Sequence, residues 1–240
     1  MKRKPFLKGF LSIIAILVLI GIILKVYVSD YYHANRYDDT NTSDVIYADY
    51  EDFVIYGNTI AQTGFIFYPG GRVEASAYEP LLKEIANEGI CCVLMKMPYN
   101  LAVLKPNAAD SAISQITTVE HWYIGGHSLG GAMAAGYAAT YKDNVDGLIL
   151  LAAYPTKQID KSIPVLSIYG TNDGVLDKEK YKKSISLAPN FNEVLIEGGN
   201  HAFFGNYGKQ KNDGDATITK EEQWQQTKDN IVKFIEKNNQ

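Results

Sequence analysis

Short apolar segments recur along most of the chain and are separated by stretches in which apolar residues have helical spacing. The segments predicted as strands are DVIYADY and DFVIYG, which start the domain as a hairpin, followed by GFIFYPGG, ICCVLMKM, HWYIGG, VDGLILLAAYP, PVLSIYG and NEVLIEGG. Strands that are apolar throughout and alternate with helices are typical of a parallel sheet covered on both faces. The pattern therefore predicts an α/β fold.

The stretches between the strands predict the covering helices. EASAYEPLLKEIANEG places its apolar residues on one helical face and stops at Gly89. Two further helices are expected from NAADSAISQITTV and DKEKYKKSISLA, and the small residues of LGGAMAAGYAATY suit a helix that packs close to the sheet. A last helix is expected from about Lys220 to Lys237, because Thr219 and Glu222 have the spacing of a capping box.

A longer apolar run lies near the N-terminus. Residues 9–28 are mostly apolar, come close to the roughly 20 residues that a bilayer-spanning helix needs, and follow a basic stretch. No A-x-A-like cleavage site or lipobox cysteine follows the run, which favours an uncleaved anchor over a cleaved secretory signal. The positive-inside rule then places the N-terminus in the cytoplasm and everything after about Ser29 on the extracytoplasmic face.

The chain therefore divides into four predicted parts: a basic cytoplasmic tail at 1–8, a transmembrane anchor at 9–28, a polar spacer at 29–42 and an α/β domain at 43–240. A net charge of -4 argues against a nucleic-acid partner, and no obligate protein partner is predicted. The two cysteines, Cys91 and Cys92, are neighbours in a predicted strand. Neither a disulfide framework nor a cysteine metal site is therefore expected.

The candidate chemistry centres on the segment IGGHSLGG, which contains a G-x-S-x-G pattern at Gly126, Ser128 and Gly130. The pattern lies between a predicted strand and a predicted helix, at the edge of the sheet where open parallel sheets bind ligands. Glycines two residues before and after a serine remove Cβ atoms that would collide at a sharp strand-to-helix turn. Ser128 is thus a candidate nucleophile, and the alternative is that the glycines only allow a tight connection.

A serine nucleophile needs a base and an orienting acid further along the chain. Asp173 follows the strand PVLSIYG, and His201 follows the next strand, NEVLIEGG. Asp177 is a fallback acid, although it more naturally caps the helix that begins after it. The other histidines are poorly placed for the base: His33 in the spacer, His121 at the start of a strand and His127 beside the serine.

The remaining candidate residues surround this predicted site. The backbone N–H groups of Leu129 and of Gly71, with Arg72 as the next choice, are expected to form an oxyanion hole. Arg72 and Lys96 follow strand ends and are candidate contacts for an anionic substrate group, although ordinary solvated charge is the favoured interpretation.

The segment after His201 is longer than a simple loop to the last helix requires. Phe203, Phe204 and Tyr207 are candidate walls of an acyl pocket. The sequence NDGD resembles part of a calcium loop, but it lacks the ordered acidic spacing and terminal glutamate, so no metal is assigned.

From about Val45 onward the chain resembles the α/β-hydrolase superfamily, in particular its small lidless fold-5 group of dienelactone hydrolase-like enzymes. The resemblance rests on FYPGGRVEASAY, VLMKMPYNLAVL, IGGHSLGGAMAA, LLAAYP, SIYGTNDG and IEGGNHAFFGNYG in that order. It implies Ser128 as nucleophile, Asp173 as acid and His201 as base, with no cofactor. Many relatives have His-Gly in the oxyanion loop where this chain has Pro69-Gly70.

A short connection between two predicted strands indicates the substrate class. LLAAYPTKQIDKSIPVLSIYG leaves only about a dozen residues between two strands, too few for a helical lid. The prediction is an open site in a membrane-anchored serine hydrolase that cleaves a small or surface-presented ester, lactone or amide. The alternatives are a catalytically silent binding module of the cell envelope and an acyltransferase that uses the same residues.

Overall fold

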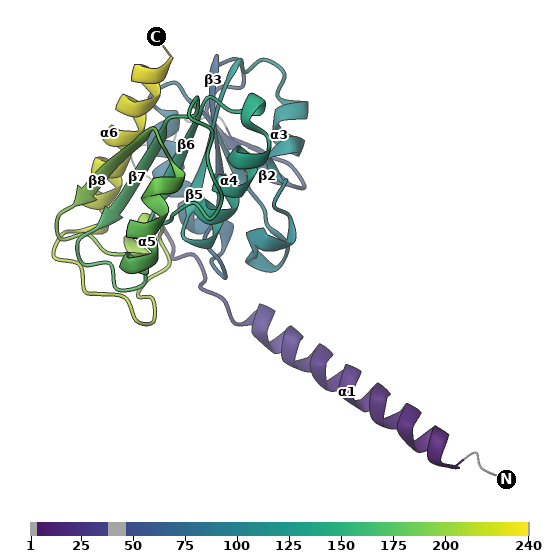
Figure 1. Cartoon of the computed structure of the whole chain (residues 1–240). Coiled ribbons are helices and arrows are strands. Elements are labelled where there is room, and N and C mark those ends of the chain that lie inside the picture. Colours follow the sequence, from purple (N-terminus) through teal and green to yellow (C-terminus); the bar gives the residue numbers. More distant parts are fainter. Residues whose placement is uncertain (1–3, 38–46, 240) are drawn as a thin grey trace. The chain divides into compact units, whose positions relative to one another are not determined.

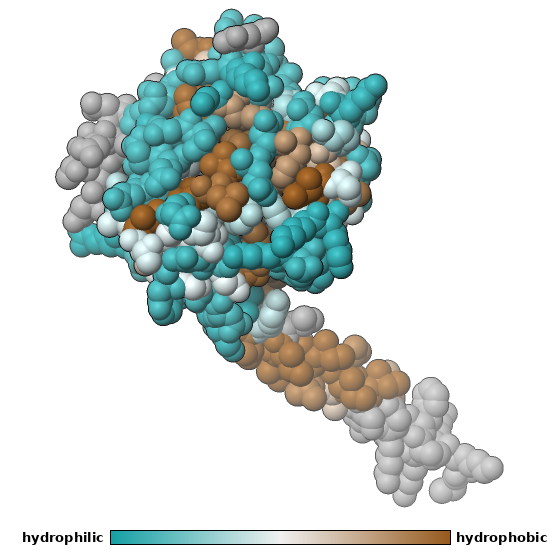
Figure 2. Space-filling model, turned by 60° about the vertical axis from the view of Figure 1, so that its left-hand side comes forward, coloured by the Kyte–Doolittle hydropathy of each residue, from teal (hydrophilic) through white to brown (hydrophobic). Residues whose placement is uncertain are grey.

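The computed structural model describes residues 4–37 and 47–239, which fall into two compact units, Met1–Tyr31 and Tyr32–Gln240. The first unit contains the helix α1 (Lys4–Ser29; Figure 1), and most of its described apolar side chains are exposed (Figure 2). In the described part of the chain, no helix combines the length and the apolar character needed to cross a membrane. A transmembrane anchor at residues 9–28 therefore stays a prediction.

The second unit is built on an eight-stranded sheet with the order β1-β2-β4-β3-β5-β6-β7-β8 (Figure 1). The strands are β1 (Tyr47–Asp49), β2 (Phe53–Tyr56), β3 (Thr63–Tyr68), β4 (Cys91–Met95), β5 (His121–His127), β6 (Gly147–Leu151), β7 (Val165–Gly170) and β8 (Phe191–Ile196). The pairs β1–β2 and β2–β4 are antiparallel, and every later pair is parallel. The predicted hairpin and the mostly parallel sheet are both confirmed.

Five helices pack around this sheet in the described residues of the second unit. They are α2 (Glu79–Ala86), α3 (Ala109–Gln115), α4 (Leu129–Thr140), α5 (Lys178–Ser184) and α6 (Lys220–Asn238). The side chains of α2 and α6 share one apolar core and those of α3 and α4 share another, so both faces of the sheet are covered, as predicted. The predicted capping box starts α6, where Thr219 accepts from the Glu222 N–H at 3.1 Å.

Strand β3 explains why the strands are apolar throughout. Because side chains alternate between faces along a strand, Ile66 and Tyr68 enter the core under α3 and α4, whereas Phe65 and Phe67 enter the core under α2 and α6. All four side chains are fully buried. A strand that is buried on both faces has no solvent side, and its sequence is therefore continuously apolar.

Residues 32–37, within the predicted spacer, belong to the second unit and pack against its loops. Tyr32 forms an isolated parallel bridge with Val73, and its N–H donates to the Arg72 carbonyl at 2.7 Å. The Asn35 N–H donates to the Asn206 carbonyl at 2.7 Å. This short segment thus joins the loop after β3 to the loop after β8. Residues 38–46, which include the predicted start of the domain at 43, lie outside the described residues.

Candidate active site

Ser128 occupies the turn between β5 and α4, with φ of 52° and ψ of -121°. A positive φ is costly for a residue other than glycine, and such strain persists only where the surrounding structure holds it. An added Cβ would lie 2.4 Å from the Tyr68 carbonyl oxygen at Gly126 and 2.2 Å from it at Gly130. The G-x-S-x-G pattern therefore has a steric cause here, because β3 approaches the turn too closely for any side chain at either glycine.

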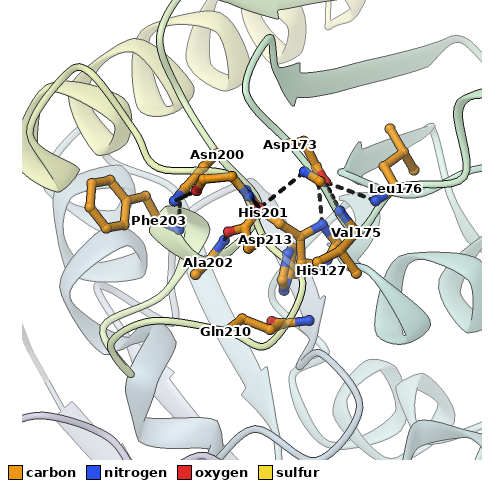
Figure 3. A network of polar contacts seen from close by, with 12 residues as sticks. His127, Asp173, Val175, Leu176, Asn200, His201, Ala202, Phe203, Gln210 and Asp213 are labelled. Atoms are coloured by element: carbon orange, nitrogen blue, oxygen red, sulfur yellow. Dashed lines mark hydrogen bonds and ion pairs between the residues drawn. The ribbon is translucent and has the colours of Figure 1, made fainter.

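Asp173 and His201 lie at the carboxyl ends of β7 and β8 and are hydrogen-bonded to each other (Figure 3). Asp173 Oδ2 is 2.8 Å from His201 Nδ1, and the two side chains are 0% and 1% exposed. The other carboxylate oxygen, Oδ1, accepts from the N–H groups of Val175 and Leu176, both at 2.8 Å. The carboxylate is thus fixed on both oxygens, which holds the imidazole with its Nδ1 proton toward Asp173.

The second ring nitrogen of His201, Nε2, is buried and has no hydrogen-bond partner among the described residues. His201 and Ser128 line the same cavity, which has a volume of about 240 Å³. The other lining residues are mostly small or apolar: Leu129, Ala132, Ala152, Ala153, Tyr154, Thr156, Val175, Leu176 and Asp177. The three residues predicted for the catalytic site are thereby brought together, because His201 bonds to Asp173 and shares the lining of one cavity with Ser128.

Residues 64–225, more than half of the chain, match the alpha/beta hydrolase family. The chain belongs to the α/β-hydrolase superfamily. No curated protein matches this α/β hydrolase. Its fold is similar to that of several solved structures, each with a sequence identity low enough that the likeness concerns the fold alone.

Three of these structures illustrate the likeness. Est1E from Butyrivibrio proteoclasticus has a TM-score of 0.58 and 15% identity, covering 80% of this chain and 99% of that one. A thermophilic esterase from Thermogutta terrifontis, Est2 with propionate bound, has a TM-score of 0.57 and 15% identity over 85% and 97% of the two chains. A predicted CIB-like hydrolase from Thermoplasma acidophilum has a TM-score of 0.56 and 17% identity over 78% and 97%.

The predicted oxyanion loop of this α/β hydrolase lies against the start of α4. A Cβ on Gly71 would come within 2.7 Å of Leu129 Cδ2, so the two predicted donor residues are neighbours. The N–H of Arg72 already donates to the Asn100 carbonyl at 2.8 Å, which favours Gly71 over Arg72 as the donor. Leu129 is the first residue of α4, and N–H groups in a first helical turn have no acceptor within the helix.

Two predicted substrate contacts are not brought to this cavity. Neither Arg72 nor Lys96 lines it. Lys96 instead lines a separate cavity beside β1, where its ammonium forms an ion pair with Asp49 and donates to the Tyr50 carbonyl at 2.6 Å. The hypothesis that Lys96 contacts substrate is therefore not supported, because its ammonium is paired with Asp49 of β1 in that separate cavity.

The aromatic residues after His201 also occupy other positions than expected. Phe204 and Tyr207 are buried beside the His127 ring, with centroid distances of 5.6 and 6.5 Å, and neither lines the cavity. Phe203 lines a different hollow on the surface. Asp177 caps α5, accepting from the Lys180 N–H at 3.0 Å, as its position in the sequence indicates.

His127 has a role in the site that sequence reasoning missed. Its ring is 1% exposed and lies 4.4 Å from the His201 ring, between centroids. Burial, and after it the neighbouring His201 imidazole, lowers the pKa of His127 well below its usual value, so the ring is neutral. Tyr78 Oη accepts from the Gly70 N–H at 3.1 Å, which leaves its own proton for His127 Nδ1 at 2.8 Å. This chain of hydrogen bonds links the predicted oxyanion loop to the residue before Ser128.

Replacing Tyr78 by phenylalanine is expected to lower the free energy of unfolding by about 1–3 kcal/mol, because two buried polar groups lose their partner. Denaturant titration of the full-length chain measures the change. Tyr47→Phe is the matched control, since the exposed Tyr47 hydroxyl only donates to Asp49 at 3.3 Å. Equal changes in the free energy of unfolding for the two substitutions would contradict the buried hydrogen bonds that Tyr78 makes to Gly70 and His127.

Proposed function

We propose that this α/β hydrolase is a serine hydrolase that cleaves small carboxylic esters through an acyl-enzyme on Ser128. The observation that carries the proposal is the state of His201, whose Nδ1 is held by the buried carboxylate of Asp173 while Nε2 has no partner among the described residues. A ring nitrogen that no other protein group engages can take the proton of a nucleophile, which is what a general base must do. The esterases of similar fold are consistent with this reaction class.

In the proposed reaction, Ser128 Oγ attacks the ester carbonyl carbon while His201 Nε2 takes the hydroxyl proton. Asp173 stabilises the imidazolium, and the N–H groups of Leu129 and Gly71 donate to the oxyanion of the tetrahedral intermediate. The C–O bond to the alcohol then breaks, and the alcohol leaves with the proton from Nε2. Water attacks the acyl-enzyme, gives a proton to the same nitrogen, and the carboxylic acid is released as Oγ recovers its proton.

The size of the cavity supports a short acyl group. Its volume of about 240 Å³ lies below the roughly 300–1,000 Å³ of pockets that hold drug-sized ligands. Three alanines, Ala132, Ala152 and Ala153, contribute to its lining. We therefore expect it to accept a short aliphatic chain.

Lengthening the acyl chain of p-nitrophenyl esters is expected to raise kcat/KM about fourfold per methylene while methylenes enter the cavity, from about 0.8 kcal/mol per buried CH₂. The gain should stop once the cavity is full. Ala132→Leu should move that limit to a shorter chain, because Ala132 lines the cavity. Gly136→Ala on the same helix is the control, since no atom lies within 4 Å of a Cβ there. A steady rise to long acyl chains would contradict a small acyl site.

A fluorophosphonate probe tests the proposed function directly. The full-length chain should gain the probe's mass on the peptide that contains Ser128, and Ser128→Ala should abolish the adduct. Ser162→Ala is the control, because Ser162 is exposed and bonds only locally to Asp160. A folded protein without the Ser128 adduct would overturn the proposal and favour a silent binding module.

Membrane anchoring through residues 9–28 and an extracytoplasmic location of the domain stay predictions from the sequence. The assignment to the small lidless group within the superfamily is likewise a proposal. It is supported by the short connection between β6 and β7. The described residues of this connection, 152–164, are irregular throughout and contain no helix that could form a lid.

A further inference from the structure

The loop that contains NDGD lies against the two turns that carry Asp173 and His201 (Figure 3). Asp213 Oδ1 accepts from the N–H of Gly174 at 3.1 Å and from the N–H of His201 at 3.2 Å. Its second oxygen, Oδ2, accepts from the N–H of Ala202 at 2.8 Å. The Asp213 carboxylate thus connects Gly174, in the turn of the acid Asp173, with the backbone of His201 and Ala202.

Neighbouring residues hold this loop firmly in place. The Gly214 N–H donates to Asp213 Oδ1 at 2.9 Å, and the Gly214 carbonyl accepts from Asn200 Nδ2 at 2.9 Å. A Cβ on Gly214 would lie 2.0 Å from the Asn172 carbonyl oxygen, so the loop and the acid turn are in direct backbone contact. The loop around Asp213 and Gly214 therefore packs between the turn before Asp173 and the turn before His201.

We propose that Asp213 is a positioning residue, whose carboxylate sets the separation of the acid turn and the base turn and so preserves the Asp173–His201 hydrogen bond. This inference rests on the proposed function. Asp213 does not line the cavity that holds Ser128, so it acts through the pair and not on the substrate. Both of its oxygens face N–H donors, which also explains why an acidic residue stands at this position in a loop that resembles a calcium-binding sequence.

Asp213→Asn is the first test, because the amide has the same shape but its NH₂ group cannot accept from an N–H donor. We expect kcat for an activated ester to fall on the order of 100-fold with KM nearly unchanged, since a small displacement of a catalytic group has an effect of this size. Asp215→Asn is the matched control. The Asp215 side chain is 85% exposed and forms an ion pair with Lys209 on the described surface, so kcat should change by less than about twofold.

A double-mutant cycle separates positioning from a purely structural role. If Asp213 acts through the Asp173–His201 pair, Asp213→Asn should lower kcat much less in the Asp173→Asn variant than in the unaltered chain. Additive losses in the double variant would overturn the inference, as would a kcat for Asp213→Asn equal to that of Asp215→Asn. If Ser128→Ala keeps full activity, the proposed function fails instead, independently of Asp213.

Amide hydrogen exchange of the unaltered chain tests the same contacts without any substitution. The N–H groups of Gly174, His201 and Ala202 should exchange more slowly than in an unstructured peptide by at least about tenfold, because Asp213 accepts from all three. Unprotected exchange at these amides would overturn the inference even if Asp213→Asn fails to fold.

Discussion

Replacing Ser128 by alanine is expected to lower kcat for a carboxylic ester by roughly 10⁶-fold, the size of effect known for loss of a serine nucleophile. The substitution removes Oγ, the atom that we propose bonds to the substrate, while the cavity and the Asp173–His201 pair remain. Steady-state hydrolysis of p-nitrophenyl butyrate by the full-length chain measures the change.

The fold should tolerate this substitution. The positive φ of Ser128 is imposed by the close approach of β3 at Gly126 and Gly130, and alanine experiences the same strain as serine. The thermal midpoint should therefore stay within a few degrees, which separates lost chemistry from lost structure. A variant that kept more than a small fraction of the activity would mean that another group is the nucleophile.

Replacing Asp173 by asparagine is expected to lower kcat by about 10⁴-fold, the size of effect known when the orienting acid of a serine hydrolase is changed in this way. The amide NH₂ group would donate to His201 Nδ1, which forces the ring proton onto Nε2. That nitrogen could then no longer accept the serine proton. The same hydrolysis assay measures the loss.

Asp177→Asn is the control for this variant. Asp177 lines the same cavity and was the alternative acid, but its carboxylate caps α5 by accepting from the Lys180 N–H. Asparagine is as good an N-cap as aspartate, so both kcat and stability should be close to those of the unaltered chain. An equal loss in the two variants would assign the orienting role to Asp177 instead.

Much of the fold follows from the apolar pattern alone. Each of the eight strands overlaps a segment predicted from the sequence, and the central strands were easy to recognise because strands buried on both faces leave a continuous apolar run. Chain order and strand ends also sufficed to select Ser128, Asp173 and His201. These three residues follow β5, β7 and β8, and parallel strands bring their carboxyl ends to one edge.

Sequence reasoning failed where strand order in space differs from strand order in the chain. Lys96 follows β4, which lies between β2 and β3 and pairs with β2, so its ammonium meets Asp49 from β1 and not the cavity at β5. The contact of His127 with Tyr78 spans 49 residues of sequence and gives no local pattern. The role of the Asp213 carboxylate could likewise not be predicted, because its partners are backbone N–H groups, which residues of almost any type could supply.

The segment from Tyr32 to Tyr37 sets the minimal size of the catalytic unit. A domain cut from the sequence at its predicted polar spacer would lack this segment, although Tyr32 bonds to Arg72 and Asn35 bonds to Asn206. Those contacts fasten the loop next to Gly71 and the loop beyond His201 to one short piece of chain. For protein engineering, residues 32–37 therefore belong with the hydrolase domain, and an expression boundary should lie ahead of Tyr32.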